Sequence, residues 1–598
     1  MSSREVPSLS SPMQSNVVAA TAVVADDTTV IDVVGSQRRV IHSRKSGPEA
    51  RWASVAAKGE RWPAIATVVA AVLAISVRAF LVMSRSFPLN DGALFLLMTE
   101  EIGDHGFRLP VMTAYNAAHI PFAYSPLGFY LAAFLHLGGG IDLFALFRIL
   151  PLVFSCLCVL AFYLLARDLA PTRATLIASL ATFAVLPRSF LWLIMGGGLT
   201  RSMGFFFAIL TLWQLHRVYS RQAWRHVPWA TLFASLTVLS HLGTAPFVAF
   251  SAVLMLLSFG RTWRSVQASL VIVAGTVVLT APWWASVAAT HGFAPFIAAG
   301  ATGGTVFGTH RGEALTKLAF FGLGTAEPLF PLIGALAILG SFAMLTRRGA
   351  FVPLWWLTII LLDTRAGATY ASIPVAMLAG LAITEVIVPI IARPPLWSGL
   401  TSSIPSGGWD IVMRAPRRRQ WAVAAVLFVL IGYGVASSVV RRPSLGAEGR
   451  YLTSLTTEDR RAMSWVVSHT PPTSRFVIMV GGAAGGWWAD RVGEWFPVLA
   501  RRVSVATVQG TEWLPAGTFE RREREYDRLQ GCAAWGARCL GQWSRTTGRA
   551  YTHVYIPKTL AFPCCEPLDS ALRHDPTYRL LFDGPGAAIY ELREPVLW

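Results

Sequence analysis

The sequence predicts a polytopic α-helical membrane protein with a C-terminal external domain of mixed α/β fold. Three observations support this fold class: hydrophobic residue types make up 54% of the 598 residues, charged residues make up only 14%, and long apolar runs recur along the chain. A soluble domain carries about 25% charged residues, so this chain lacks the charge to cover a water-exposed surface of its size. We therefore expect lipid to solvate most of it.

The basic excess bears on orientation. The chain has 51 Lys and Arg against 33 Asp and Glu, a net charge of +18. In membrane proteins, the loops that face the cytoplasm collect Lys and Arg. Nucleic-acid binding would require a basic face on a soluble domain, and the sequence shows none, so we expect no nucleic-acid partner.

Residues 1–62 are predicted to form a disordered cytoplasmic tail. They are polar, and their basic residues gather toward the end. Their one apolar run, near Val17–Ala25, is too short and lies too far from a basic flank for a signal peptide. The next run, Trp62–Met83, has about the 20 residues that a bilayer core requires. Its basic flank predicts a cytoplasmic amino terminus.

A membrane domain is predicted over residues 63–441. Ten further apolar runs follow the first, which gives about 11 spans. The basic loops all fall in the cytoplasm only if residues 122–137 do not cross the membrane, so this segment is predicted to be juxtamembrane or re-entrant. The same alternation places the loop 84–142 and the carboxyl terminus outside. Arg78 lies near the outer end of the first run, where snorkelling accounts for its charge.

Residues 442–598 are predicted to form the external domain. Strand-like runs separated by Gly and Pro, together with one helical stretch near Phe519–Leu529, indicate a small mixed α/β fold. The strand-like runs are Phe476–Val480, Val503–Val508, His553–Ile556 and Ala587–Leu592.

Four cysteines of this domain suggest two disulfides in an oxidising compartment: Cys532, Cys539, Cys564 and Cys565. Three connectivities are open. Adjacent cysteines rarely bond to each other, so Cys532 and Cys539 are the expected partners. No cysteine spacing predicts a zinc site.

The candidate catalytic residue is Asp91, which follows the first span. A carboxylate at this position borders a low-dielectric medium, which favours proton uptake and so suits a general base. The alternative is that Asp91 simply caps the apolar helix that follows it, since Asp is a favoured N-cap. A second feature of the loop is the aromatic turn Pro121–Pro126, bracketed by prolines and leading into the segment that should not cross.

This order of elements resembles the GT-C superfamily of integral membrane glycosyltransferases, and within it the protein O-mannosyltransferase and aminoarabinose-transferase branch. The resemblance rests on a cytoplasmic start, one span, Asp91 at the head of the first external loop, and a juxtamembrane segment containing Ser-Pro-Leu. The stretches Gly196–Ser202, Glu494–Pro497 and Gly510–Trp513 are also similar to bacterial members. Many members of the branch carry a second acidic residue directly after the aspartate, where this chain has Gly92.

The resemblance implies an inverting glycosyltransferase of the bacterial inner (plasma) membrane. Its donor is a sugar on a polyprenyl phosphate, and its acceptor is a glycan, lipid or protein of the cell envelope, used at the outer membrane face. Asp91 would be the base. No cofactor is required; a divalent metal is possible, but Gly92 in place of the second acid argues against a tightly held one. The alternatives are a transporter or flippase of a lipid-linked saccharide and a non-catalytic assembly protein.

External arginines are the candidates for binding the donor phosphate. Arg201 follows a three-glycine turn that would allow a close approach, and Arg365 and Arg311 lie in outer loops. Arg188 is a weaker candidate. The alternative for each is a paired or snorkelling cation. Candidates for the acceptor or sugar-binding surface are Glu494, Trp495, Glu512 and Trp513, although tryptophans are equally common in cores and at membrane interfaces.

Overall fold

The computed structural model describes the backbone of residues 48–302, 324–347, 349–363, 366–392, 412, 415–440, 452–483, 486–560 and 564–593. The chain divides into two compact units, Met1–Ala64 and Ile65–Trp598, and the second contains every site described below. Residues 1–47 and the predicted boundary at 441/442 lie outside the described residues. The first helix, α1 (Pro48–Met83), begins within the predicted irregular tail, so the end of that tail is helical instead.

The chain is a multi-pass membrane protein. Among the described residues, six stretches of helix are long and apolar enough to cross a membrane. Further helices lie between them, several too short to cross alone, so the predicted total of about 11 spans stays a prediction. The six stretches are Trp62–Met83 in α1, α4 (Leu143–Leu169), Leu242–Phe259 with α8 (Ala245–Phe259), α9 (Trp263–His291), Gly367–Ala392 and α17 (Arg417–Val439).

The remaining helices complete the membrane region. The stretch Gly367–Ala392 consists of α14 (Gly367–Ala382), one π-helical turn at Ile383–Ile387 and α15 (Val388–Ala392). The others are α5 (Arg173–Val185), α6 (Gly198–Arg221), α7 (Val227–Ser240), α10 (Ala294–Thr302), α12 (Leu332–Thr346) and α13 (Phe351–Leu362).

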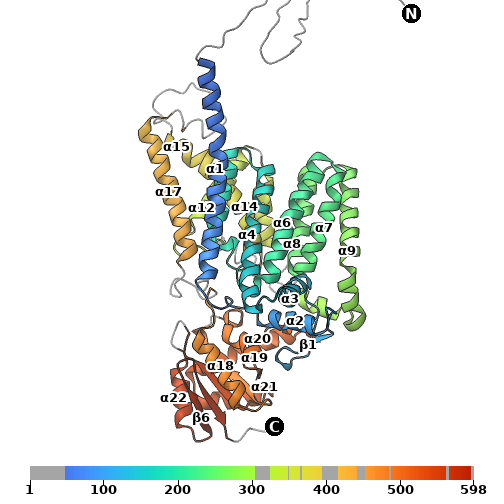
Figure 1. Cartoon of the computed structure of the whole chain (residues 1–598), viewed down its shortest axis with the longest axis vertical. Coiled ribbons are helices and arrows are strands. Elements are labelled where there is room, and N and C mark those ends of the chain that lie inside the picture. The colour runs from blue at the N-terminus through green and yellow to red at the C-terminus, as the bar shows by residue number, and fades with distance from the viewer. Residues whose placement is uncertain are drawn as a thin grey trace, which may run out of the picture. The chain divides into compact units, whose positions relative to one another are not determined.

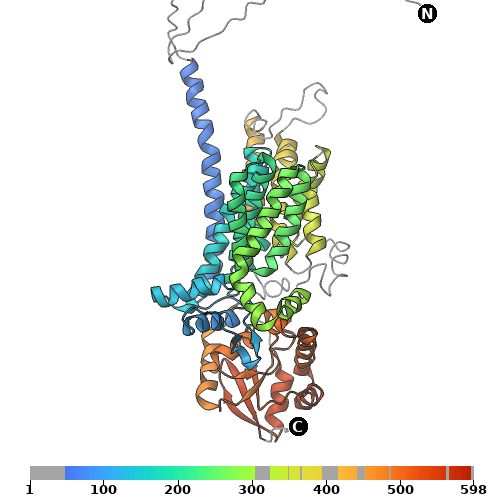
Figure 2. The same ribbon diagram turned by 90° about the vertical axis from the view of Figure 1, so that its right-hand side faces the viewer.

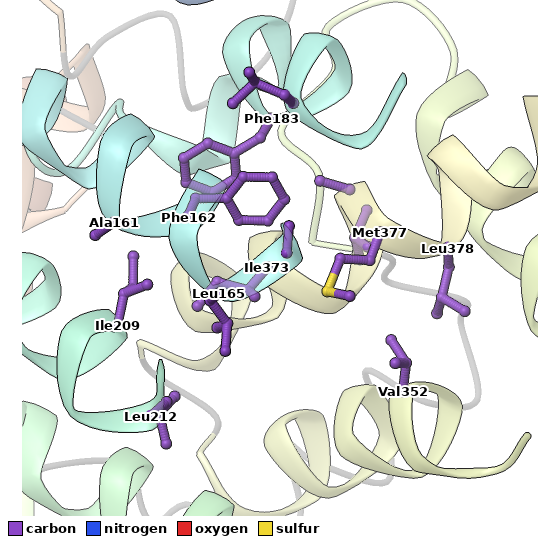
Figure 3. Close-up of a cluster of buried hydrophobic side chains, with 14 of the residues drawn as sticks. Ala161, Phe162, Leu165, Phe183, Ile209, Leu212, Val352, Ile373, Met377 and Leu378 are labelled. Atoms are coloured by element: carbon purple, nitrogen blue, oxygen red, sulfur yellow. The ribbon is translucent and has the colours of Figure 1, made fainter. Parts of the chain in front are cut away.

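An apolar core joins α4, α5, α6, α13 and α14 (Figure 3). Phe162 of α4 and Phe183 of α5 stack with ring centroids 4.2 Å apart and nearly parallel planes. Small residues allow the helix backbones to approach closely, as expected where lipid provides no hydrophobic force between helices. Gly380 of α14, for example, would place a Cβ atom 2.5 Å from the backbone nitrogen of Ser179.

Arg78 does not snorkel, so that interpretation was wrong. Its side chain is fully buried. The guanidinium donates hydrogen bonds to Ser155 Oγ of α4 (3.3 Å), to the Ala184 carbonyl of α5 (3.0 Å) and to Ser189 Oγ (3.0 Å). These bonds tie α1 to α4, to α5 and to the short 3₁₀ turn Pro187–Ser189, which precedes the segment that carries the site.

The loop 84–142 forms a layer at one end of the helices (Figures 1 and 2). It contains α2 (Ala93–Asp104), the short antiparallel pair β1 (Met112–Thr113) and β2 (Ile120–Pro121), and α3 (Leu127–Gly139). With 13 residues, α3 is shorter than the roughly 20 that a span requires, which agrees with the predicted juxtamembrane segment 122–137.

Residues 452–593 form a five-stranded mixed sheet with helices around it. The strand order is β4-β3-β5-β7-β6, with β3 parallel to β4 and β5, and β7 antiparallel to β5 and β6. The strands are β3 (Arg475–Ile478), β4 (Val503–Ser504), β5 (His553–Pro557), β6 (Tyr578–Asp583) and β7 (Ala587–Leu592). The helices are α18 (Thr457–His469), α19 (Arg491–Leu499), α20 (Thr518–Gly531), α21 (Ala537–Thr547) and α22 (Glu566–His574).

The disulfides differ in part from the expectation. Cys532 bonds to Cys539, and the adjacent residues Cys564 and Cys565 bond to each other. The expectation that the adjacent pair stays unbonded was therefore wrong. Cys565 has a positive φ of 69°, a backbone conformation that sequence spacing does not reveal.

Candidate active site

The segment that carries Asp91 is held between the membrane helices and residues 452–593. The backbone N–H of Asn90 donates to the Thr453 carbonyl (2.8 Å), and the Gly196 N–H donates to the Leu89 carbonyl (2.9 Å). The segment is thus bonded on one side to the residues after the last described membrane helix and on the other to the turn before α6. Asp91 is fixed by its neighbours although it lies in a loop.

The Asp91 carboxylate accepts two hydrogen bonds from the start of α6. Its Oδ1 accepts from the backbone N–H of Gly197 (2.9 Å), and its Oδ2 accepts from Nη2 of Arg201 (2.8 Å). The N-terminus of a helix carries partial positive charge and free N–H groups, which stabilise an anion. The side chain keeps 17% of its surface exposed, so it is held in place yet remains accessible.

Asp91 does not cap the helix that follows it. The N-cap of α2 is Gly92, which makes no side-chain capping hydrogen bond. The Asp91 carboxylate instead accepts hydrogen bonds at the N-terminus of α6. The simple capping alternative was therefore wrong, and the carboxylate joins two segments about a hundred residues apart in sequence.

Arg201 lies between Asp91 and an indole ring. Its Nε donates to the Trp192 carbonyl (3.1 Å), and its guanidinium carbon lies 5.7 Å from the centroid of the Trp192 ring. The guanidinium carbon of Arg188 lies 5.4 Å from the same ring. Two cations therefore share one aromatic side chain beside Asp91. The other phosphate candidates, Arg365 and Arg311, lie outside the described residues.

The three-glycine turn leaves room for the Asp91 segment to pack against it. A Cβ atom on Gly196 would lie 2.0 Å from the Asp91 carbonyl oxygen, and one on Gly197 would lie 2.7 Å from Asp91 Oδ2. We predicted that this turn would allow a phosphate to approach, but in the structure it allows the Asp91 segment to approach. The approach of a phosphate to this turn stays a prediction.

Gly92 has a backbone conformation that residues with a Cβ atom rarely adopt. Its φ is +121°, and a Cβ atom would lie 2.8 Å from the carbonyl carbon of Gly196. An acidic side chain directly after Asp91 would have no room here. A second carboxyl group nevertheless lies beside Asp91, and residues 452–593 supply it.

That carboxyl belongs to Glu494, on the first turn of α19. Its Oε1 accepts a hydrogen bond from the backbone N–H of Gly92 (2.8 Å), and the residue is 5% exposed. Burial raises the pKa of Glu494 well above its usual value, and the charge of Asp91 raises it further. The Glu494 side chain is thus almost entirely covered by protein and accepts from the Gly92 backbone, so the prediction that it forms part of a sugar-facing surface is corrected.

Trp495 is also corrected as a sugar-binding residue, because it is fully buried. Its indole N–H donates to the Asn90 carbonyl (2.9 Å), and its ring centroid lies 4.7 Å from that of Phe87. Trp495 therefore holds the Asp91 segment in place through its contacts with Asn90 and Phe87.

Replacing Trp495 with phenylalanine is expected to lower the thermal stability of the purified protein. The change leaves the Asn90 carbonyl buried without this donor, which costs about 1–3 kcal/mol. Trp535, 80% exposed, is the matched control, because W535F should leave the melting temperature unchanged. Equal melting temperatures for W495F and the wild type would contradict the supporting role.

Glu512 and Trp513 contact the outer loop. The Tyr124 hydroxyl donates to Glu512 Oε1, and the Trp513 ring centroid lies 4.7 Å from that of Tyr124 and 6.2 Å from that of Phe296. Trp513 is 6% exposed, so it does not present an open face to a sugar in this structure. The two residues join the proline-bracketed turn and α10 to residues 452–593.

Sequence reasoning missed Asp490, which starts α19. Its carboxylate accepts from the Gly493 N–H (2.8 Å) and from the Tyr526 hydroxyl (3.1 Å). Burial raises the pKa of Asp490 to about 6 despite these bonds. An Asp ahead of a short amphipathic helix could have been recognised as an N-cap, but its burial depends on the tertiary fold.

Asp490→Asn is expected to change how stability depends on pH. The pKa of Asp490 is about 6 in the folded protein and about 3.9 in an unfolded chain, so the folded protein binds more protons between these values. The free energy of unfolding contributed by Asp490 therefore falls as pH rises from about 4 to about 6. Asparagine caps equally well and does not ionise. The stability of D490N relative to wild type should rise by on the order of 1–3 kcal/mol over this range, measured by thermal unfolding. A difference independent of pH would contradict the assignment.

The described residues contain no group of three or more His, Cys, Asp and Glu side chains that could hold a metal ion. Asp91 and Glu494 are two carboxyl groups, one of them already bonded to Arg201. Metal dependence stays a prediction.

No protein-family model and no curated protein matches the sequence. Among solved structures, the chain is similar to the arabinofuranosyltransferase AftD from Mycobacteria, with 15% identity and a TM-score of 0.47 over 89% of this chain and 40% of that one. The chain thus spans less than half of AftD. It is also similar to ArnT from Cupriavidus metallidurans in the apo state, with 15% identity and a TM-score of 0.49 over 90% of this chain and 98% of that one.

A second ArnT structure, bound to undecaprenyl phosphate, has 14% identity and a TM-score of 0.47 over 88% of this chain and 97% of that one. AftD and ArnT are both glycosyltransferases of the GT-C superfamily, which the sequence itself resembles. Identities of 14–15% and TM-scores below 0.5 do not establish the activity of this chain or the roles of its residues.

Proposed function

We propose that this protein transfers a sugar from a polyprenyl-phosphate donor to a cell-envelope acceptor at the outer face of the inner membrane. The observation that supports the proposal best is Asp91, a carboxylate held by Gly197 and Arg201 where the membrane helices meet the outer loop. Such a group can take the proton of an attacking hydroxyl.

The proposed transfer step uses Asp91 as the base. The acceptor oxygen attacks the anomeric carbon of the sugar while its proton passes to Asp91. The bond between the anomeric carbon and the phosphate oxygen breaks, and the polyprenyl phosphate leaves with the electron pair. Attack opposite the leaving group inverts the anomeric centre.

Arg201 is placed to interact with both the base, Asp91, and the leaving phosphate. Among the described residues, two of its five N–H groups are used, one by Asp91 and one by the Trp192 carbonyl. When Asp91 takes the proton its charge disappears, while negative charge develops on the leaving phosphate. A cation beside both groups stabilises the transition state more than the ground state. Arg188, near the same indole ring, is proposed as a second phosphate contact, and Arg365 and Arg311 remain proposed ones.

The outer-face location is supported by contact between distant segments. Since Glu494 bonds to Gly92, the loop 84–142 and residues 452–593 lie on the same side of the membrane. The chain must therefore cross the membrane an even number of times between them. The basic residues of the loops between spans then favour the outer side for both.

Mass spectrometry of the lipid-linked sugars tests this function. Cells that lack the protein should accumulate a polyprenyl-phosphate sugar, and the purified protein should convert that lipid to free polyprenyl phosphate in the presence of an envelope extract. A flippase, the alternative from another class, would move the lipid across a vesicle membrane without changing its mass. An unchanged lipid would exclude the transferase.

A further inference from the structure

We infer that Glu494 is a positioning residue for Asp91. The site is then complete only when α19 packs against the outer loop. The inference rests on the proposed function and adds to it a residue more than four hundred positions from the base. The contact that carries it is the hydrogen bond of 2.8 Å from the Gly92 N–H to Glu494 Oε1.

The N–H of Gly92 needs an acceptor from outside its own helix. The first N–H groups of a helix have no backbone partner within it, and the N–H of the N-cap residue is usually accepted by a Glu or Gln side chain three residues further on. In α2 that position is Phe95, which offers no acceptor. Gly92 occupies the N-cap of α2 and has no side chain, because any Cβ would meet Gly196. Glu494 supplies the acceptor, so the peptide that follows Asp91 is fixed by a side chain of another segment.

Two more bonds hold α19 in this position, and a third holds the turn that precedes it. Within Glu494 itself, the backbone carbonyl accepts from the Tyr115 hydroxyl (2.7 Å). One residue on, the Trp495 indole donates to the Asn90 carbonyl (2.9 Å), and Asn90 Nδ2 donates to the Trp488 carbonyl (3.1 Å). Both residues that flank Asp91, Asn90 and Gly92, are therefore bonded to residues 486–499, whereas Asp91 itself is bonded to α6.

The chemical state of Glu494 fits a positioning role. The group is buried beside the Asp91 carboxylate, and both conditions raise its pKa, which favours its neutral form. In that form Glu494 adds no second negative charge to the site beside Arg201. A neutral carboxyl keeps its carbonyl oxygen as an acceptor for the Gly92 N–H.

Three substitutions of Glu494 separate positioning from other roles. E494A removes the acceptor and should lower kcat by about 10- to 100-fold with the donor KM unchanged, because a shift of the base by about 1 Å has effects of this size. E494D should behave like E494A, because its shorter side chain does not reach Gly92. E494Q keeps a neutral acceptor of the same length and should retain most of the wild-type kcat. E566A, at an exposed glutamate on α22, is the matched control.

Hydrogen–deuterium exchange gives a readout that does not depend on transfer. Peptides covering residues 87–98 should exchange faster in E494A and E494D than in the wild type, and at the wild-type rate in E494Q and E566A. If the wild type transfers no sugar at all, the proposed function fails while this readout still decides the positioning. Wild-type exchange in E494A would overturn the inference, and so would an E494Q enzyme as impaired as E494A.

Discussion

Asp91→Asn is expected to lower sugar transfer by about 10²- to 10⁴-fold, the contribution typical of a general base. The amide keeps an oxygen that can accept from the Gly197 N–H, so the fold at this point should persist. It has no charge to pair with Arg201 and cannot take the proton of the acceptor hydroxyl. The measurement is the conversion of the lipid-linked donor by purified protein, with the melting temperature recorded in parallel.

Asp104→Asn is the matched control for this experiment. Asp104 lies at the other end of α2, exposed to solvent, and the substitution makes the same chemical change. D104N should retain wild-type transfer. A folded D91N protein with unchanged transfer would show that Asp91 is not the base.

Gly92→Ala is expected to reduce transfer by about 100-fold or more. A methyl group at this position meets the backbone of Gly196 at 2.8 Å, and backbone cannot rotate away as a flexible side chain does. The φ of +121° adds strain for any residue with a Cβ. The Asp91 segment must shift, and a displacement of about 1 Å at the reacting groups is sufficient for a loss of this size.

Gly106→Ala separates the two causes. Gly106 also has a positive φ, +61°, but a Cβ atom there has open space around it. G106A should therefore show the small cost of a strained backbone with transfer close to wild type. If G92A transferred sugar as well as G106A does, the close approach of the Asp91 segment to Gly196 would have no role in catalysis.

The predictions of strands and helices that succeeded depend on the pattern of apolar and polar residues over a few neighbouring positions. Four strands of residues 452–593 match apolar runs divided by Gly and Pro, and α20 matches the predicted helical stretch near Phe519–Leu529. Residues Tyr578–Asp583 were missed as a strand, because they form an irregular edge with a register shift at Leu580 and Phe582. Register and edge position follow from pairing with a neighbour, which no local pattern contains.

The assignment of roles to tryptophan and arginine succeeded less well. Both residue types have an apolar body and a polar end, so composition leaves open whether a ring contacts a sugar or a core. Trp495 and Trp513 proved buried, Arg78 proved to be a buried tie between helices, and Arg201 proved to be paired with Asp91. Each outcome depended on which distant backbone groups lay within reach.

The amino-acid sequence alone determined that this is a membrane protein of many helices, that an aspartate follows its first span, and that a segment with strands follows its last. These features are local, because the length of an apolar run and the alternation of a strand are properties of neighbouring residues. The tertiary structure alone decided what surrounds that aspartate. Gly197, Arg201, Gly92 and Glu494 lie up to about four hundred residues apart, and only folding brings their hydrogen-bonding groups within 3 Å of one another or of Asp91.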